Sequence, residues 1–372
     1  MNRLMVLGTA ALVAIAACSP DSKSVTGLAA DRAVQIDAEA QGAVYALTNQ
    51  TTDNAVAVFA RSADGALTWQ ASVPTGGSGA GSGLGSQGAL ASSADGRWLF
   101  AVNAGSNDVS AFQVTPGGLS LTSRVASGGI RPISVTVHGD LLYVLNAGGD
   151  GNISGFSLGS DGALSPIAGS SRPLSGSAVG PAQVSFSPNG RWLVVTEKAT
   201  NRLDVYAVNE GGVTSAVRTT ASAGGTPFGF AFGHRDELFV SEAAGSASSY
   251  EIERDGSLNV ASGAVVTHQG APCWAVVTKN GKFGYTANAQ GGSISGFSIN
   301  NDGAIALIDG DGRTAVVGGG NIDLAVSGNS RYLYQLNGNR SISGFRIEAD
   351  GHLTAVGNIA GLPASTVGLV AR

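Results

Sequence analysis

Two carboxylates end apolar, alternating runs of the sequence and could carry chemistry. Glu197 closes the run "WLVVTE", and Glu242 closes "LFVSE". A carboxylate in such a place could act as a general acid or base, or supply oxygen ligands to Ca²⁺. A side chain at a strand end can equally bond to the turn that follows it and have only a structural role. Both interpretations remain open from the sequence.

The two glutamates belong to a series of seven strand-end residues, of which the other five are amides. The series is Asn49, Asn103, Asn146, Glu197, Glu242, Asn288 and Asn337. Arg202 lies shortly after Glu197, and His268 lies shortly before the segment "APCW". The catalytic candidates among these residues are Glu197, Glu242 and His268, and the candidate Ca²⁺ ligands are Glu197, Glu242 and Asn288.

Other reactive groups give weaker signals. The four histidines, at positions 138, 234, 268 and 352, show no short paired spacing, so no zinc motif is predicted. The stretch "GGSGAGSGLGSQG" (76–88) imitates a phosphate-binding loop but lacks its lysine, and we interpret it as a flexible loop on the face of the candidate site. Cys273 is the only cysteine after Cys18, so we expect a small buried residue and no intramolecular disulfide.

Two recurring markers define the architecture that must position these residues. An aromatic residue in the middle of a strand recurs every 44 to 53 residues, at Phe59, Phe112, Phe156, Tyr206, Tyr250, Phe297 and Phe345. A glycine that opens a turn recurs with it, at Gly65, Gly117, Gly162, Gly211, Gly256, Gly303 and Gly351. Repeats of this length with several short strands are typical of propeller blades. The predicted fold is all-β, a seven-bladed β-propeller.

The two ends of the repeat region complement each other. The first repeat begins at residues 44–47 with no innermost strand before them, and the chain ends in an extra strand at residues 366–371. We predict that 366–371 pairs with 44–47 and closes the ring, because an open sheet edge would otherwise remain.

The first residues are typical of a targeting segment. Residues 1–18 read as a signal peptide, with Arg3 before an apolar run too short to span a bilayer. Its end resembles a bacterial lipobox, which would make Cys18 a lipidated N-terminus; simple cleavage is the alternative. Residues 19–42 form a polar tether, and residues 43–372 form the propeller. We expect an exported protein, on the periplasmic face of the outer membrane if lipidated and otherwise periplasmic or secreted.

The charge of the chain limits its partners. A formal net charge of −5 and an isoelectric point near 5.3 leave no broad basic field, so nucleic-acid binding is not expected. The expected partner is a small lactone or organic acid, or a protein of the cell envelope. Membrane contact is expected only through the lipid anchor, and the protein is expected to be a monomer.

Three segments give residues 43–372 a family resemblance: "PAQVSFSPNGRWLVVTEKATNRLDVY", "GTPFGFAFGHRDELFVSEA" and "CWAVVTKNGKFGYTANAQGGSISGFSI". The chain resembles the lactonase family of seven-bladed propellers, which includes bacterial 6-phosphogluconolactonases and fungal carboxymuconate cyclases. The resemblance implies polar groups at the mouth of the central channel, including a Pro-His and a Pro-Arg-His. The corresponding residues here are Pro181-Ala182 and Pro227-Phe228-Gly229, so the histidine and arginine are absent. Glu242 and Arg202 match family positions, so the resemblance adds Arg202 to the catalytic candidates.

The resemblance implies one function and leaves a second open. The first is a hydrolase of a small, non-phosphorylated sugar or organic-acid lactone, or a related cycloisomerase, with no certain cofactor and Ca²⁺ as the candidate. The alternative is a non-catalytic propeller of the cell envelope that binds a protein or small-molecule partner. The absent histidine and arginine favour the alternative, because lactone opening needs a base and a group that stabilises the oxyanion. The retained Glu242 and Arg202 favour the hydrolase.

Overall fold

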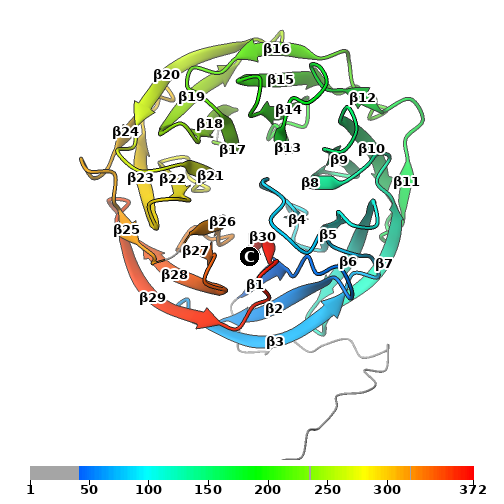
Figure 1. The fold of residues 1–372 in the computed structure, drawn as a ribbon, viewed down its shortest axis with the longest axis horizontal. Helices are drawn as coiled ribbons and strands as arrows, with labels where there is room; N and C mark the ends of the chain where they lie inside the picture. The colour runs from blue at the N-terminus through cyan, green and yellow to red at the C-terminus, as the bar shows by residue number, and fades with distance from the viewer. Residues whose placement is uncertain (1–41, 234–235, 319) are drawn as a thin grey trace, which may run out of the picture. The chain divides into compact units, whose positions relative to one another are not determined.

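The computed structural model describes residues 42–372, apart from 234–235 and 319. These residues form seven antiparallel β-sheets arranged in a ring (Figure 1). The seven-bladed all-β propeller predicted from the repeats is therefore confirmed. No helix in this part of the chain is long and apolar enough to cross a membrane. The predicted signal peptide with Cys18, the tether up to residue 41, and His234 lie outside the described residues.

The strands follow the sequence from the innermost to the outermost position of each blade. Blades 1 to 3 contain β1 (Gly42–Leu47), β2 (Ala55–Arg61) and β3 (Leu67–Pro74); β4 (Leu90–Ser92), β5 (Trp98–Asn103), β6 (Asp108–Thr115) and β7 (Gly118–Ala126); and β8 (Pro132–His138), β9 (Leu141–Asn146), β10 (Asn152–Leu158), β11 (Leu164–Pro166) and β12 (Arg172–Pro173). Blades 4 and 5 contain β13 (Pro181–Phe186), β14 (Trp192–Glu197), β15 (Arg202–Ala207) and β16 (Arg218–Ala221); and β17 (Pro227–Phe232), β18 (Glu237–Glu242), β19 (Ser246–Ile252) and β20 (Leu258–Val266).

Blades 6 and 7 complete the ring. They contain β21 (Pro272–Val277), β22 (Phe283–Asn288), β23 (Ser293–Ile299), β24 (Ile305–Leu307) and β25 (Ala315–Val316); and β26 (Asn321–Val326), β27 (Tyr332–Asn337), β28 (Ser341–Ile347) and β29 (Leu353–Ala360). The last strand, β30 (Val367–Ala371), pairs antiparallel with β1 as the innermost strand of blade 1. The predicted closure by the C-terminus is confirmed.

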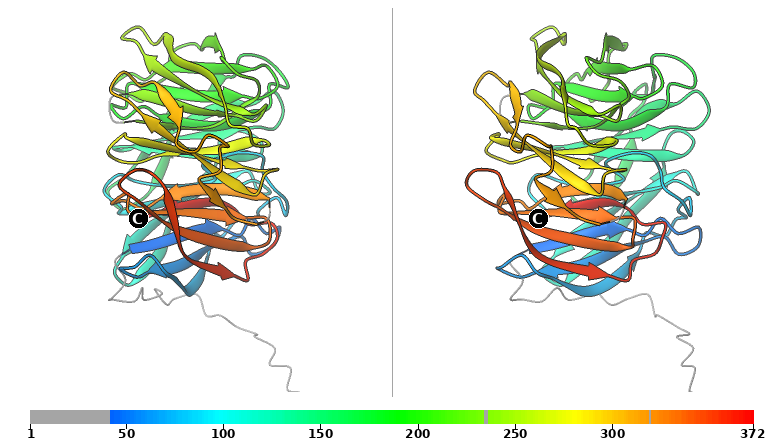
Figure 2. Two further views of the ribbon diagram at one scale, coloured as in Figure 1. Left: turned by 90° about the vertical axis from the view of Figure 1, so that its left-hand side faces the viewer. Right: turned by 60° about the vertical axis from the view of Figure 1, so that its left-hand side comes forward.

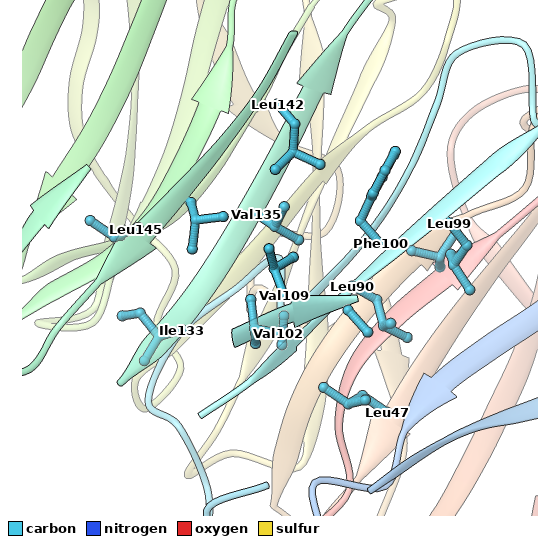
Figure 3. Close-up of a cluster of buried hydrophobic side chains, with 14 of the residues drawn as sticks. Leu47, Leu90, Leu99, Phe100, Val102, Val109, Ile133, Val135, Leu142 and Leu145 are labelled. Atoms are coloured by element: carbon cyan, nitrogen blue, oxygen red, sulfur yellow. The ribbon is translucent and has the colours of Figure 1, made fainter. Parts of the chain in front are cut away.

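Burial explains why the inner strands read as nearly continuous apolar runs. Every residue of β2 is buried, because neighbouring blades cover both faces of the inner strands. The outermost strand β3 instead has one buried residue, Ala71, and is otherwise exposed or half-buried. Between blades 2 and 3, Val102 and Val109 lie in one apolar cluster with Ile133 and Val135 (Figure 3). Packing between blades therefore supplies the core.

The connections emerge at two opposite faces of the ring (Figure 2). On one face, the turn after each blade's second strand bonds to the segment that leads into the same blade's innermost strand. Lys198 N donates to Gly180 O at 3.0 Å, and Ala243 N donates to Thr226 O at 2.8 Å. We refer to this side as the mouth face. The strand ends nominated from the sequence all adjoin it.

Candidate functional site

The seven strand-end residues are buried inside their blades. Six of them are the last residues of β5, β9, β14, β18, β22 and β27, and Asn49 follows β1. None has an exposed fraction above 1%. A ligand at the mouth face would not reach these side chains in this structure.

The asparagines of the series bind neighbouring strands. Asn288 Nδ2 donates to the hydroxyls of Ser293 and Ser295, at 3.0 and 2.9 Å. Asn337 Nδ2 donates in the same way to Ser343 Oγ at 2.9 Å. These bonds fix the turn to the third strand of the blade. The Oδ1 atom of Asn288 is buried and has no hydrogen-bond partner among the described residues.

Glu242 has the environment of a structural group. Its carboxylate accepts hydrogen bonds from Gly224 N at 2.7 Å and from the hydroxyls of Ser222, Ser246 and Ser248 at 3.1, 2.6 and 2.6 Å. Its exposed fraction is 0%. Four donors use the available lone pairs of a carboxylate, so this side chain holds the segment before β17 against the blade.

Glu197 has a similar environment but a second acid beside it. Its carboxylate accepts bonds from Ser175 N at 3.0 Å, Ser175 Oγ at 2.5 Å and Thr200 Oγ at 2.6 Å. Asp204, on the neighbouring strand β15, is also fully buried. Burial, and then the Glu197 carboxylate, raise the pKa of Asp204 to about 8. Asp204 therefore carries a proton at neutral pH.

The remaining nominated residues lie apart from one another. Arg202 is exposed at the start of β15, where its backbone lies opposite that of Glu197 in the strand register. His268 is exposed in the connection between β20 and β21, with a left-handed backbone (φ 57°). In the described part of the chain, no group of three or more His, Cys, Asp or Glu side chains could hold a metal ion. Glu197, Glu242 and Asn288 belong to three different blades.

Lys198, a cation that was not among the candidates from the sequence, lies at the channel mouth. Lys198 follows Glu197 in the chain, and its Nζ lies 4.9 Å from the ring centroid of Phe228. Phe228 occupies the position where the family resemblance implies arginine. Lys198 thus restores a positive charge beside this position from the neighbouring blade. Burial is the main cause that lowers the pKa of the half-buried Lys198 amine to about 8, with a smaller contribution from the charge of Arg131.

The aromatic and thiol groups around Lys198 make the inner wall of the mouth. Phe228 packs edge-on against Trp274, with ring centroids 5.2 Å apart. Cys273 is buried, as expected, and its burial raises the pKa of the thiol to about 11. It is therefore a neutral thiol at physiological pH. The wall is apolar apart from the Lys198 amine.

The glycine-rich loop covers this wall and is held in place by hydrogen bonds. The pale-blue segment before β4 projects into the centre of the ring (Figure 1). Gln87 Nε2 donates to Ala275 O at 2.7 Å, and Ala275 N donates to Gln87 Oε1 at 2.9 Å. Trp274 Nε1 donates to Ser86 O at 2.9 Å, and Lys198 Nζ donates to Gly85 O. The loop lies on the predicted face, but it is anchored to the inner strands rather than free.

The position of Gln87 explains one glycine. A Cβ atom at Gly229 would lie 2.0 Å from Gln87 Oε1. The absence of a side chain at Gly229 therefore makes room for the amide of Gln87 beside β21. Below the loop, a cavity of about 500 Å³ runs along the innermost strands β4, β8, β13, β26 and β30. Gln87 and Gly88, at the end of the loop, are among the residues that line this cavity.

A second cavity, of about 270 Å³, opens beside the loop between blades 3 and 4. Lys198 and Arg131 both line it, with apolar contributions from Leu84, Ile133 and Val179. Asp150 lies on the same rim. Neither Glu197 nor Glu242 is among the described residues that line it. We refer to this cavity as the mouth pocket. It is the concave place on this face where two cations meet apolar walls.

One column of the repeats carries a signal for Lys198. The residues that follow the seven strand ends are Gln50, Ala104, Ala147, Lys198, Ala243, Ala289 and Gly338. Only Lys198 is charged. Arg131 has no comparable signal, because its approach to Lys198 depends on how blades 3 and 4 pack.

Comparisons with known proteins agree with the fold. The profile of the family "Lactonase, 7-bladed beta-propeller" matches residues 42–172, 156–244 and 234–314. No curated protein sequence matches the chain. The solved structure of the periplasmic gluconolactonase PpgL from Pseudomonas aeruginosa is similar, with a TM-score of 0.69 and 18% identity over 88% of this chain and 98% of that one.

Two further solved structures have the same architecture. A Bacteroides fragilis protein, provisionally assigned as a 6-phosphogluconolactonase, has a TM-score of 0.67 and 20% identity over 90% of this chain and 98% of its own. A protein from Lactobacillus plantarum has a TM-score of 0.72 and 18% identity over 89% and 98%. Likenesses at this level of identity establish the fold alone.

Proposed function

Because the chain belongs to the lactonase family of seven-bladed β-propellers, we propose that it hydrolyses a small, non-phosphorylated lactone of a sugar or organic acid in the mouth pocket. The observation that carries this proposal is Lys198, which lines the mouth pocket and whose half-buried amine has a pKa lowered to about 8. An amine with such a pKa is partly neutral near physiological pH and can accept a proton.

The proposed reaction uses water as the nucleophile. The neutral amine of Lys198 takes a proton from water while the water oxygen bonds to the lactone carbonyl carbon. The guanidinium of Arg131 would stabilise the oxyanion that forms. This role needs another donor here, because the family arginine is absent. The ring C–O bond then breaks, and the leaving alkoxide receives the proton from the Lys198 ammonium. The product is an open-chain hydroxy acid.

The choice of a non-phosphorylated substrate depends on the proposed location. A signal peptide in residues 1–18 would export the protein, with lipidation at Cys18 as one route to the outer membrane. The name of the similar Pseudomonas aeruginosa protein, periplasmic gluconolactonase, is consistent with both the location and a sugar lactone without phosphate. An exported enzyme would meet such lactones rather than phosphorylated intermediates of the cytoplasm.

A second candidate is a non-catalytic propeller that binds an envelope partner or small molecule. The observation in its favour is that both strand-end carboxylates are fully buried and hydrogen-bonded, Glu197 by three donors and Glu242 by four. If these carboxylates have only a structural role, neither is available as a catalytic acid or base.

The test is proton release by the full-length protein with D-glucono-1,5-lactone, dihydrocoumarin and 6-phosphogluconolactone, each with Ca²⁺ and with chelator. We expect turnover of a non-phosphorylated lactone. Lys198→Met should lower kcat/KM by about 100-fold or more, the usual contribution of a general base. Lys282→Met, at an exposed lysine in the turn before β22, is the matched control and should leave the rate unchanged. No turnover of any lactone, or a fully active Lys198→Met variant, would reject the proposal. Loss of activity with chelator would implicate a metal.

A further inference from the structure

The mouth pocket holds two cations without an acidic partner. Lys198 and Arg131 both line it, and the charge of Arg131 disfavours a second charge on Lys198. Among the described residues, no carboxylate forms an ion pair with either side chain. Asp150 shares the rim of the pocket, yet it bonds to neither cation. No ion pair in the described part of the chain therefore offsets the positive charge of these two side chains.

The interactions that Lys198 does make are weak substitutes for an anion. Its Nζ donates to the Gly85 carbonyl and lies over the Phe228 ring. A neutral carbonyl and an aromatic face return less of the lost hydration energy than a negative charge would. A ligand oxygen would use another of the three N–H donors of the ammonium or displace the Gly85 carbonyl. An anion that entered the pocket would gain two charge-assisted hydrogen-bond donors.

We infer that Lys198 and Arg131 form a binding subsite for the carboxylate of a small organic monoanion. The apolar side chains of Leu84, Ile133 and Val179 would contact its carbon skeleton. Ligand pockets commonly span about 300–1,000 Å³, so the smaller volume of about 270 Å³ suits a compact ligand. The Asp150 carboxylate would repel a doubly charged phosphate more strongly than a single carboxylate. The identification of this ligand as a hydroxy acid, the product of lactone opening, rests on the proposed function; the subsite itself does not.

The subsite has a defined pH dependence. An anion stabilises the ammonium form of Lys198, so affinity should be greatest below pH 8 and should fall as the amine loses its proton. The other ionisable groups that face this amine are Arg131, Cys273 and the rim carboxylate of Asp150. Cys273, with a pKa of about 11, stays neutral over this range. A Lys198→Arg variant keeps the charge and should bind the anion equally at pH 7 and pH 9.

The experiment is calorimetric titration of the full-length protein with D-gluconate at pH 7 and pH 9, with sorbitol as the neutral analogue and inorganic phosphate as the competing anion. We expect gluconate to bind at pH 7, with affinity reduced about tenfold or more by Lys198→Met or Arg131→Met, the loss typical of one charge-assisted hydrogen bond. Lys282→Met should have no effect. Sorbitol should not bind, and phosphate should bind more weakly than gluconate.

Several results would overturn the inference. These are equal gluconate affinity in the wild type and both methionine variants, equal binding of sorbitol, tighter binding of phosphate, or affinity that does not fall at pH 9 in the wild type. The outcome is separable from that of the proposed function. Gluconate binding without lactone turnover would retain the subsite and reject the hydrolase. Turnover that needs Lys198 without gluconate binding would do the reverse.

Discussion

Replacing Asp204 with asparagine should stabilise the propeller at neutral and alkaline pH. Asp204 occupies a position on the third strand where five other blades carry serine, namely Ser110, Ser154, Ser248, Ser295 and Ser343. A serine hydroxyl can donate to the strand-end residue beside it, as Ser248 does to Glu242 at 2.6 Å. An ionised Asp204 beside Glu197 has nothing to donate. Asparagine has the same shape as aspartate and carries a permanent N–H donor.

The pKa shift sets the magnitude. The pKa of Asp204 rises from 3.8 to about 8, through burial first and the Glu197 carboxylate second. Each unit corresponds to about 1.4 kcal/mol, which gives an upper bound of about 6 kcal/mol at pH 8. Structural relaxation and water around the carboxylate offset part of this, so we expect asparagine to add about 2–3 kcal/mol to the free energy of unfolding at pH 8.

The sign follows from proton binding. A carboxyl group whose folded pKa lies above its unfolded pKa binds more protons in the folded state, so its deprotonation opposes folding. Asp204 should not lower the free energy of unfolding below pH 4. Its destabilising effect should grow as pH rises from 4 to 8 and should be constant above pH 8. Asp323 should contribute a similar slope, because burial raises its pKa to about 8 as well.

The assay is urea unfolding of the full-length protein at pH 5, 6, 7 and 8. The wild type should lose stability across this range, and Asp204→Asn should lose less, so that the two curves diverge as pH rises. Asp302→Asn, at an exposed turn of blade 6, controls for the loss of a surface charge and should parallel the wild type. A curve for Asp204→Asn that runs parallel to the wild type, or a variant less stable than wild type at pH 8, would show that Asp204 is not a strained, protonated acid.

Two further predictions concern the fold and the second glutamate. Deletion of residues 365–372 removes β30, the innermost strand of blade 1, and should abolish the cooperative melting transition followed by circular dichroism; an unchanged melting temperature would contradict ring closure by this strand. Glu242→Gln places an amide N–H among the four groups that now donate hydrogen bonds to Glu242. It should lower the free energy of unfolding, measured in urea, by about 3 kcal/mol, the cost of one or two unsatisfied buried groups. Native stability with loss of lactonase activity would instead assign Glu242 a catalytic role.

The architecture was predictable because it depends on repeated residues. Seven aromatic residues at near-constant spacing specify seven equivalent sheets, and the unpartnered strand at 44–47 requires a partner from the other end of the chain. The structure supplies that partner as β30. Packing of like blades against one another leaves few alternative arrangements for such a sequence. The fold could therefore be predicted from local sequence patterns.

The site was less predictable because its contacts cross between blades. A glutamate at a strand end looks the same in sequence whether it caps a turn or faces a ligand, and the saturation of Glu242 by Gly224 and three serines appears only in three dimensions. The loop at 76–88 was interpreted as flexible from its glycine and serine content. Its anchors are Gln87 on Ala275 and Ser86 on Trp274, residues 188 positions apart in each case.

Departures from the repeat pattern converge on blade 4. This blade has Glu197 where five blades have asparagine, Asp204 where five have serine, and Lys198 in a column that is otherwise uncharged. Asp204 and Lys198 cost stability, because burial shifts the pKa of each group toward its neutral form. A chain that needed only to fold would gain from the residues used in its other blades. Of the three, only Lys198 lines the mouth pocket, whereas Glu197 and Asp204 are buried inside the blade. Since proteins break local rules mainly where a ligand repays the energy, Lys198 is the exception that a functional site would explain.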